Sequence, residues 1–298
     1  MNTIAETEKT SQPTPRMAEG RQPFAYRRDY DGNRFVYFTL SSRARGLSIG
    51  VNLNPDKRCN FDCTYCEVDR RGPVSDSALD FTLMATELKS TLALVRNGRL
   101  RERWPYSQVP PDLLLLRHVA ISGDGEPTLC PCFRAAVETV VHVRATSGGP
   151  FFKIVLITNA SNLDVAEVQS GLQLFTLQDE IWAKLDVGTE EQMNLLNKSE
   201  VTVEKILSNI LLIARQRSVV IQSLFPALNG CAPGEQDIEQ YAQRLKELTA
   251  AGAQISLVQI YSATRPTVNP ACGHLPLRTL CRIAQTVRNR TGLNVEIF

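Results

Sequence analysis

The chain has 298 residues, of which 43% are hydrophobic, and its 33 Lys and Arg residues nearly balance its 31 Asp and Glu residues. This length and composition suffice to bury a large core, either as one α/β domain or as two small ones. The formal net charge of +2 excludes the strongly basic composition typical of nucleic-acid-binding proteins, although a local basic patch is compatible with it.

The apolar segments give no sign of a membrane or secretory destination. The first ten residues are polar and lack the apolar stretch of a signal peptide. No apolar run approaches the ~20 residues that a membrane-spanning helix needs. Eight cysteines without a secretion signal are typical of the reducing cytosol, where thiols bind metals or simply pack. We therefore expect a soluble, cytoplasmic protein without a membrane partner.

Two parts of the chain differ in character. Residues 1–22 are rich in Ser, Thr, Pro, Glu and Arg and poor in apolar residues, which predicts a disordered tail. Residues 23–298 contain neither an internal repeat nor a linker. We therefore expect them to form a single domain with short extensions at both ends.

From residue 35 onwards, apolar runs typical of buried strands alternate with segments of helical periodicity. We expect strands at 35–40, 47–53, 117–122, 152–158, 180–187, 218–225, 255–261 and 294–298. We expect helices at 81–96, 131–144, 163–171, 190–197, 201–217, 234–250 and 277–290. Six strands that are each followed by a helix imply a parallel sheet with right-handed crossovers, either an open doubly wound sheet or an incomplete barrel.

Three cysteines lie close together, directly after the expected strand 47–53. Cys59, Cys63 and Cys66 have the spacing C-x3-C-x2-C, and Tyr65 precedes the last of them. Thiolates bind iron–sulfur clusters and zinc, but a structural zinc site usually has four ligands from paired C-x2-C elements. Three thiolates would leave one iron of a [4Fe-4S] cluster without a protein ligand. The alternatives are a zinc site completed from elsewhere in the chain and three thiols without a metal.

This triad resembles the signature of the radical S-adenosylmethionine (SAM) superfamily. The resemblance implies that the three cysteines ligate a [4Fe-4S] cluster, that the open iron chelates SAM, and that Tyr65 helps to seat it. It also implies reductive cleavage of SAM to methionine and a 5′-deoxyadenosyl radical, with an electron donor such as flavodoxin or ferredoxin. Radical SAM cores are partial (β/α)6 TIM barrels. The resemblance covers about residues 47–262 and therefore favours the incomplete barrel.

A glycine-rich segment follows the strand expected at 117–122, where the ligands of parallel sheets bind. It consists of Gly123, Asp124, Gly125, Glu126 and Pro127. The segment is similar to the superfamily's Gly-Gly-Glu-Pro element, with Asp124 in place of a glycine. The segment alone would favour an ordinary glycine-rich turn between a strand and a helix. Because it follows the cysteine triad in the right order, the resemblance implies instead that it holds the amino group of SAM.

The next two strand ends carry further candidates. Asn159 is expected either to approach SAM and the substrate, as the resemblance implies, or to cap the following helix. Lys184 and Asp186 are two residues apart in an expected strand, so their side chains share one face. Within an otherwise apolar run they either contact a ligand, for which the resemblance suggests the SAM carboxylate and ribose, or form a buried ion pair. His118, at the start of its strand, is expected to be structural.

A narrower resemblance concerns the wyosine-type tRNA-modifying radical SAM enzymes. It rests on Asn-Phe-Asp-Cys at 60–63, Gly-Glu-Pro-Thr at 125–128 and the segment 258–267. Those enzymes carry further cysteines before the triad for a second cluster, whereas the first cysteine here is Cys59. The other cysteines have no recurring spacing and leave an auxiliary cluster undecided. They are Cys130, Cys132, Cys231, Cys272 and Cys281.

We therefore expect a radical SAM enzyme that acts on a small molecule, an RNA or a peptide, which the sequence does not distinguish. The competing hypothesis is a non-catalytic iron–sulfur or zinc protein that senses metal or redox state. Arg265, which follows the strand expected at 255–261, either holds a carboxylate or phosphate of the substrate or covers the mouth of the domain.

Overall fold

A computed structural model describes residues 23–72 and 78–298 of the chain, so the expected tail at 1–22 lies outside the described residues. The main strands are β1 (Val36–Ser41), β2 (Gly46–Val51), β3 (Leu116–Ile121), β4 (Lys153–Thr158), β5 (Glu180–Lys184), β6 (Val219–Leu224), β8 (Ile255–Tyr261) and β10 (Val295–Ile297). The α-helices are α1 (Phe81–Arg96), α2 (Phe133–Thr146), α3 (Ala166–Leu172), α4 (Glu190–Leu196), α5 (Val203–Ala214), α6 (Glu235–Ala250) and α7 (Leu277–Thr291). The described part also contains five short 3-10 helices and a two-stranded pair, β7 (Ala227–Leu228) and β9 (Cys272–Gly273), which the sequence did not predict.

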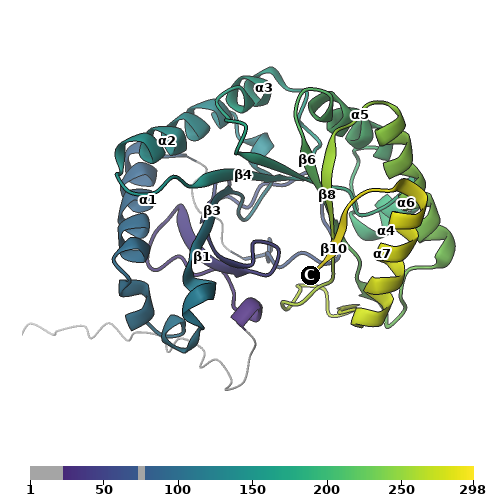
Figure 1. Ribbon diagram of the computed structural model, residues 1–298, viewed down its shortest axis with the longest axis horizontal. Coiled ribbons are helices and arrows are strands. Elements are labelled where there is room, and N and C mark those ends of the chain that lie inside the picture. The colour runs from purple at the N-terminus through teal and green to yellow at the C-terminus, as the bar shows by residue number, and fades with distance from the viewer. Residues whose placement is uncertain (1–22, 73–77) are drawn as a thin grey trace, which may run out of the picture.

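The eight main strands form one curled sheet in the order β1-β2-β3-β4-β5-β6-β8-β10. Within this sheet β2, β3, β4, β5, β6, β8 and β10 run parallel, and only β1 is antiparallel to its neighbour. The strand order never reverses, as it would in a doubly wound sheet. The helices lie around the outside of the curled sheet (Figure 1). The expected partial barrel is therefore confirmed, with β1 and β10 at its two open edges.

The two faces of the sheet differ in polarity because side chains alternate along each strand. Outward-facing residues such as Val119, Ile121 and Leu156 are fully buried in the large apolar core beneath the helices. On the inner face, Val155, Trp182 and Val220 form a small separate cluster. The rest of the inner face is largely polar and lines the site described below.

Two arginines connect the open edges of the barrel. Arg265, in the loop after β8, donates to the carbonyl oxygens of Leu40 at 2.8 Å and Phe24 at 3.2 Å. Arg45, in the turn between β1 and β2, pairs with Glu296 of β10 at 2.8 Å. Arg265 also lines the cavity on the inner face of the barrel and pairs with Glu67 at 3.4 Å, so both roles expected for it stay predictions. No helix among residues 23–72 and 78–298 is long and apolar enough to cross a bilayer.

A buried ion pair fixes α2 against the sheet. Asp179, just before β5, accepts from Arg144 of α2 at 2.6 Å and from the backbone N–H of Ile154 at 2.7 Å. Neither side chain of the pair is more than 8% exposed. Burial alone would raise the pKa of Asp179, but the hydrogen bonds from Arg144 and the backbone outweigh it and hold that pKa below its usual value.

The Asp179→Asn substitution should therefore lower the free energy of unfolding by about 3–5 kcal/mol, because it leaves the Arg144 guanidinium buried without its anion. Asp164→Asn is the matched control, since the pair of Asp164 with Lys205 is about 40% exposed and should contribute less than about 1 kcal/mol. Urea unfolding measures the free energy of unfolding of both variants. Equal losses in both variants would contradict this assignment.

The ion pair also predicts a pH dependence of stability. Because the pKa of Asp179 is lowered on folding, the stability that its carboxylate contributes is present at neutral pH and should be lost as the pH falls below about 4.

Candidate cofactor-binding site at the strand ends

The cysteine loop follows β2 and is held by backbone hydrogen bonds on two sides. The N–H groups of Asp62 and Thr64 donate to the carbonyl oxygens of Asn197 and Leu196, at the end of α4, at 3.0 and 2.8 Å. On the other side, the carbonyl of Arg58 accepts from the N–H of Glu126 at 3.0 Å. The loop is thereby fixed between the segment after β3 and the helix after β5.

Cys59, Cys63 and Cys66 all line one cavity on the inner face of the barrel. Each sulfur accepts one N–H group: from the backbone of Phe61 at 3.5 Å, from Asn197 Nδ2 at 3.4 Å and from Arg70 Nη1 at 3.4 Å, in that order. Burial raises the pKa of the Cys59 thiol to about 12 and that of Cys63 to about 11. These two thiols are therefore protonated at neutral pH, although Arg70 and Lys184 lie nearby.

The sulfurs do not converge on a single point. No three His, Cys, Asp or Glu side chains in the described part of the chain are placed to hold one metal ion. A mononuclear zinc site needs such convergence. A four-iron cluster does not, because each thiolate binds a different iron. Three thiols that line one cavity are compatible with a cluster, whereas the described part of the chain holds no group of three ligands for a single metal ion.

The glycine-rich segment packs against the start of the cysteine loop. A Cβ atom on Gly123 would lie 2.2 Å from Asn52 Oδ1, and one on Gly125 would lie 2.0 Å from the carbonyl oxygen of Arg58. Only glycine permits an approach this close. The two glycines therefore let the segment after β3 reach the cysteine loop, and all of Gly123 to Glu126 line the cysteine cavity.

The two acidic residues of this segment already have partners. The Asp124 carboxylate accepts from Arg28 at 2.7 Å, Tyr30 at 2.9 Å and Asn52 at 2.9 Å. The Glu126 carboxylate accepts from Thr158 Oγ1 at 2.6 Å and from the N–H of Asn159 at 2.7 Å, which joins the ends of β3 and β4. Burial nevertheless raises the pKa of Glu126. Pro127 directly follows and begins a short 3-10 helix (Pro127–Leu129).

Asn159 lines the cysteine cavity and contacts the cysteine loop. Its Nδ2 donates to Asn60 Oδ1 at 2.9 Å, and its Oδ1 accepts from the backbone N–H of Ser161 at 3.0 Å. The second contact closes an Asx turn. Asn159 does not cap the following helix, as the alternative expectation had it, because α3 begins only at Ala166, with Val165 at its N-cap position and no side-chain cap. The first contact adds a side-chain bridge between the end of β4 and the loop that carries the triad.

Lys184 and Asp186 are linked, but they face different cavities. The Lys184 ammonium lies 3.2 Å from Asp186 Oδ1 and 3.2 Å from the Tyr261 hydroxyl, and it lines the cysteine cavity. Burial acts to lower the pKa of Lys184, but the charge of Asp186 outweighs it and raises that pKa. The chain leaves β5 at Lys184, three residues sooner than expected. Asp186 therefore follows the end of the strand, and it does not line the cysteine cavity.

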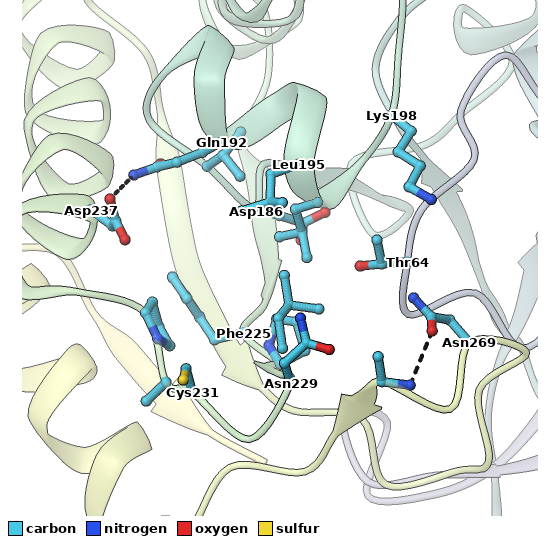
Figure 2. Close-up of a pocket in the computed structure, with 17 residues that line it drawn as sticks. Thr64, Asp186, Gln192, Leu195, Lys198, Phe225, Asn229, Cys231, Asp237 and Asn269 are labelled. Carbon is cyan, nitrogen blue, oxygen red and sulfur yellow. Dashed lines mark hydrogen bonds between the residues drawn. The ribbon is translucent and has the colours of Figure 1, made fainter.

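The Asp186 carboxylate is instead occupied by the protein. Besides Lys184, it accepts from the hydroxyl of Tyr65, from Asn197 Nδ2 at 3.0 Å and from the N–H of Leu224 at 2.8 Å. It borders a second cavity, of about 480 Å³, which is drawn in Figure 2. Thr64, Leu196 and Phe225 line that cavity as well. A direct contact between Asp186 and SAM stays a prediction.

Several residues at this site carry no sequence signal. Arg28 and Tyr30 reach Asp124 from the N-terminal segment, more than 90 positions away along the chain. His118 lines the cysteine cavity, although its place early in a strand suggested a purely structural role.

The five cysteines outside the triad differ in burial. Cys130 and Cys272 are buried, whereas Cys132, Cys231 and Cys281 are exposed. An auxiliary cluster at these five cysteines stays an open alternative.

Comparisons with solved structures bear on the fold. A radical SAM methyltransferase from Sphaerobacter thermophilus superposes with a TM-score of 0.60 and 16% identity over 90% of this chain and 70% of that chain. TYW1 with a lysine–pyruvate adduct superposes with a TM-score of 0.54 and 13% identity over 86% and 84%. The chain has the radical SAM fold. This confirms the fold that the cysteine triad led us to expect.

Comparisons with curated sequences add relatives without a stated activity. A UPF0026 protein of Helicobacter pylori J99 is 25% identical over 229 residues, which are 75% of this chain and 66% of that protein. A UPF0026 protein of Methanocaldococcus jannaschii is 25% identical over 211 residues, 70% of this chain and 59% of that protein. The aligned region thus spans two thirds or less of these relatives. No family model matches the chain.

The close approach at Gly125 generates a prediction. Gly125→Ala should lower the free energy of unfolding by about 1–3 kcal/mol, because the new methyl group would push the Arg58 carbonyl and the cysteine loop away. Gly273→Ala is the control, since its Cβ would meet nothing closer than 3.9 Å. Urea unfolding of both variants measures the difference. A loss at Gly125 below about 0.5 kcal/mol would show that the loop yields freely.

Proposed function

We propose that this chain is a radical SAM enzyme with a single core domain. It would bind one [4Fe-4S] cluster through Cys59, Cys63 and Cys66 and cleave SAM reductively to start radical chemistry on a substrate. The supporting observation is that three separated thiols, each with an N–H donor, face one cavity with the glycine-rich segment. The sensor hypothesis is less favoured, because the proteins that share this fold are described as enzymes.

The residues of the site fit the cluster on chemical grounds. Burial keeps the Cys59 and Cys63 thiols protonated in the free protein, and iron would supply the positive charge that stabilises their thiolates. N–H donors such as Asn197 and Arg70 are the groups that tune the potential of such clusters. When bound, the cluster supplies the electron for cleavage of SAM, and the fourth iron is open because the loop offers three thiols.

Lys184 is the best-placed charged group for SAM. An ammonium has three N–H donors, and Asp186 and Tyr261 take two of them. The third is free for an anionic oxygen such as the SAM carboxylate. We assign Asp186 the role of positioning Lys184 and Tyr65. The segment from Gly123 to Pro127 and Asn159 would complete the SAM site through their backbone and amide groups, as the resemblance implies.

The proposed reaction requires an electron donor and a substrate. Flavodoxin or ferredoxin would supply the electron in the cytoplasm, where thiols stay reduced. The substrate is a small molecule, an RNA or a peptide. A tRNA substrate of the wyosine type is less well supported, because the additional cysteines of those enzymes have no counterpart before Cys59.

The cluster assignment predicts the metal content of the protein. Anaerobically reconstituted wild type should hold about four irons and four sulfides per chain, and it should form 5′-deoxyadenosine from SAM under dithionite. Serine at Cys59, Cys63 or Cys66 should abolish both iron retention and cleavage, because hydroxyl oxygen replaces thiolate poorly on iron. Cys130→Ala and Cys272→Ala are the controls and should keep the cluster. Bound zinc in place of iron, or iron loss in the controls, would refute the assignment.

The role of Lys184 predicts a change in affinity. Lys184→Met should weaken SAM binding by about ten- to a hundredfold in calorimetric titration, the loss expected for one charge-assisted hydrogen bond. Only preparations with wild-type iron content are compared, and Lys246→Met, on the exposed face of α6, is the control. Asp186→Asn should lower the melting temperature of the protein, and its loss of SAM affinity should be smaller than that of Lys184→Met. An equal loss of affinity in Asp186→Asn would instead favour direct contact of both residues with SAM.

A further inference from the structure

The cationic side chains around the cysteine cavity leave one positive charge without a partner. Five of them line this cavity: Arg28, Arg43, Arg70, Lys184 and Arg265. Four of these pair with carboxylates, namely those of Asp124, Asp62, Asp186 and Glu67. Within the described part of the chain, Arg43 is in no ion pair, and its Nε is buried without a hydrogen-bond partner.

Arg43 is nevertheless held in place. Its guanidinium carbon lies 4.0 Å from the centroid of the Tyr261 ring, a favourable cation–π contact. The hydroxyl of that tyrosine accepts from Lys184, so the position of Arg43 is coupled to the site through one rigid ring. A buried donor that the protein leaves unpaired costs free energy. A ligand that pairs with it would recover this cost.

The surroundings of Arg43 are suited to an oxyanion. Ser48 and His118, both 2% exposed, line the same cavity from the inner faces of β2 and β3. Burial lowers the pKa of His118 to about 3, so its imidazole is neutral at physiological pH and offers a hydrogen bond without a second charge. The planar guanidinium fork matches the geometry of carboxylate and phosphate oxygens.

Arg43 precedes the first residue of β2, whereas the cysteine loop follows its last residue, and the side chain of Arg43 lies against the Tyr261 ring. We propose that Arg43 is the counterion for an oxyanion, carboxylate or phosphate, carried by the substrate and not by SAM. This inference rests on the proposed function and restricts its substrate to an anionic one.

Thermal unfolding of the reconstituted protein tests the anion site with inorganic phosphate or acetate, each against chloride of equal ionic strength. Phosphate or acetate should raise the melting temperature of the wild type by about 2–4 °C at about ten times its dissociation constant. Arg43→Gln should lose this shift. Arg45→Gln is the matched control, because Arg45 lies in the same turn but pairs with Glu296 at the surface, and it should keep the shift. The anion that stabilises more strongly identifies the substrate group.

Two further results decide between Arg43 as an anion site and a merely structural arginine. Without added anion, Arg43→Gln should melt at the same temperature as the wild type or higher, because it removes the buried Nε donor that has no hydrogen-bond partner. A lower melting temperature of Arg43→Gln, together with equal anion shifts in all three proteins, would overturn the proposal.

Calorimetric titration of SAM should give affinities within about twofold for wild type and Arg43→Gln. A larger loss would assign Arg43 to SAM instead. The anion shift does not depend on SAM cleavage, so failure of the cleavage assay would leave it interpretable.

Discussion

The buried carboxylate of Asp186 connects the parts of the protein on which the candidate site depends. It accepts hydrogen bonds from β6 through Leu224, from the end of α4 through Asn197 and from the cysteine loop through Tyr65. A carboxylate buried this deeply is tolerated only when it is paired and fully hydrogen-bonded. The requirement to satisfy this one charge therefore fixes the cysteine loop relative to the sheet.

Asn197 extends the same network to the cluster ligands. Its single side-chain amide group contacts Asp186, the hydroxyl of Tyr65 and the sulfur of Cys63, while its backbone carbonyl binds Asp62. The loop itself has no regular secondary structure. Its geometry consequently comes from contacts with α4 and with the segment after β3, and a cluster bound there would experience the same fixed N–H donors.

The outer face of the sheet packs against the helices and the inner face does not, and this difference explains why the candidate site lies inside the barrel. The outer face carries the apolar core that stabilises the fold, so the inner face is free to be polar. Side chains such as Ser48, His118 and Lys184 are costly to bury, and they are found along one cavity. Ligands that pair with them, a cofactor or an anionic substrate, would recover part of that cost.

The sequence by itself determined the strands, the helices and the triad of Cys59, Cys63 and Cys66. These follow from local patterns: apolar periodicity, glycines and a fixed spacing of thiols. The partial barrel was implied only by the resemblance to the radical SAM superfamily, because periodicity left an open doubly wound sheet as an alternative. The sequence also identified Lys184 and Asp186 as a pair on one strand. It missed the early end of β5, which turns Asp186 away from the cysteine cavity, because a strand end depends on hydrogen bonds with other segments.

Only the tertiary structure decided which distant residues complete the site. Arg28 reaches Asp124, Asn197 reaches Cys63, and Arg43 stacks on Tyr261. Each contact joins segments that are far apart in the chain, and none has a periodicity or a motif that marks it. The charge left unpaired at Arg43 likewise emerges only when all neighbouring cations and carboxylates are placed in space. Burial and pairing are properties of the folded chain, because they depend on which groups exclude water from one another.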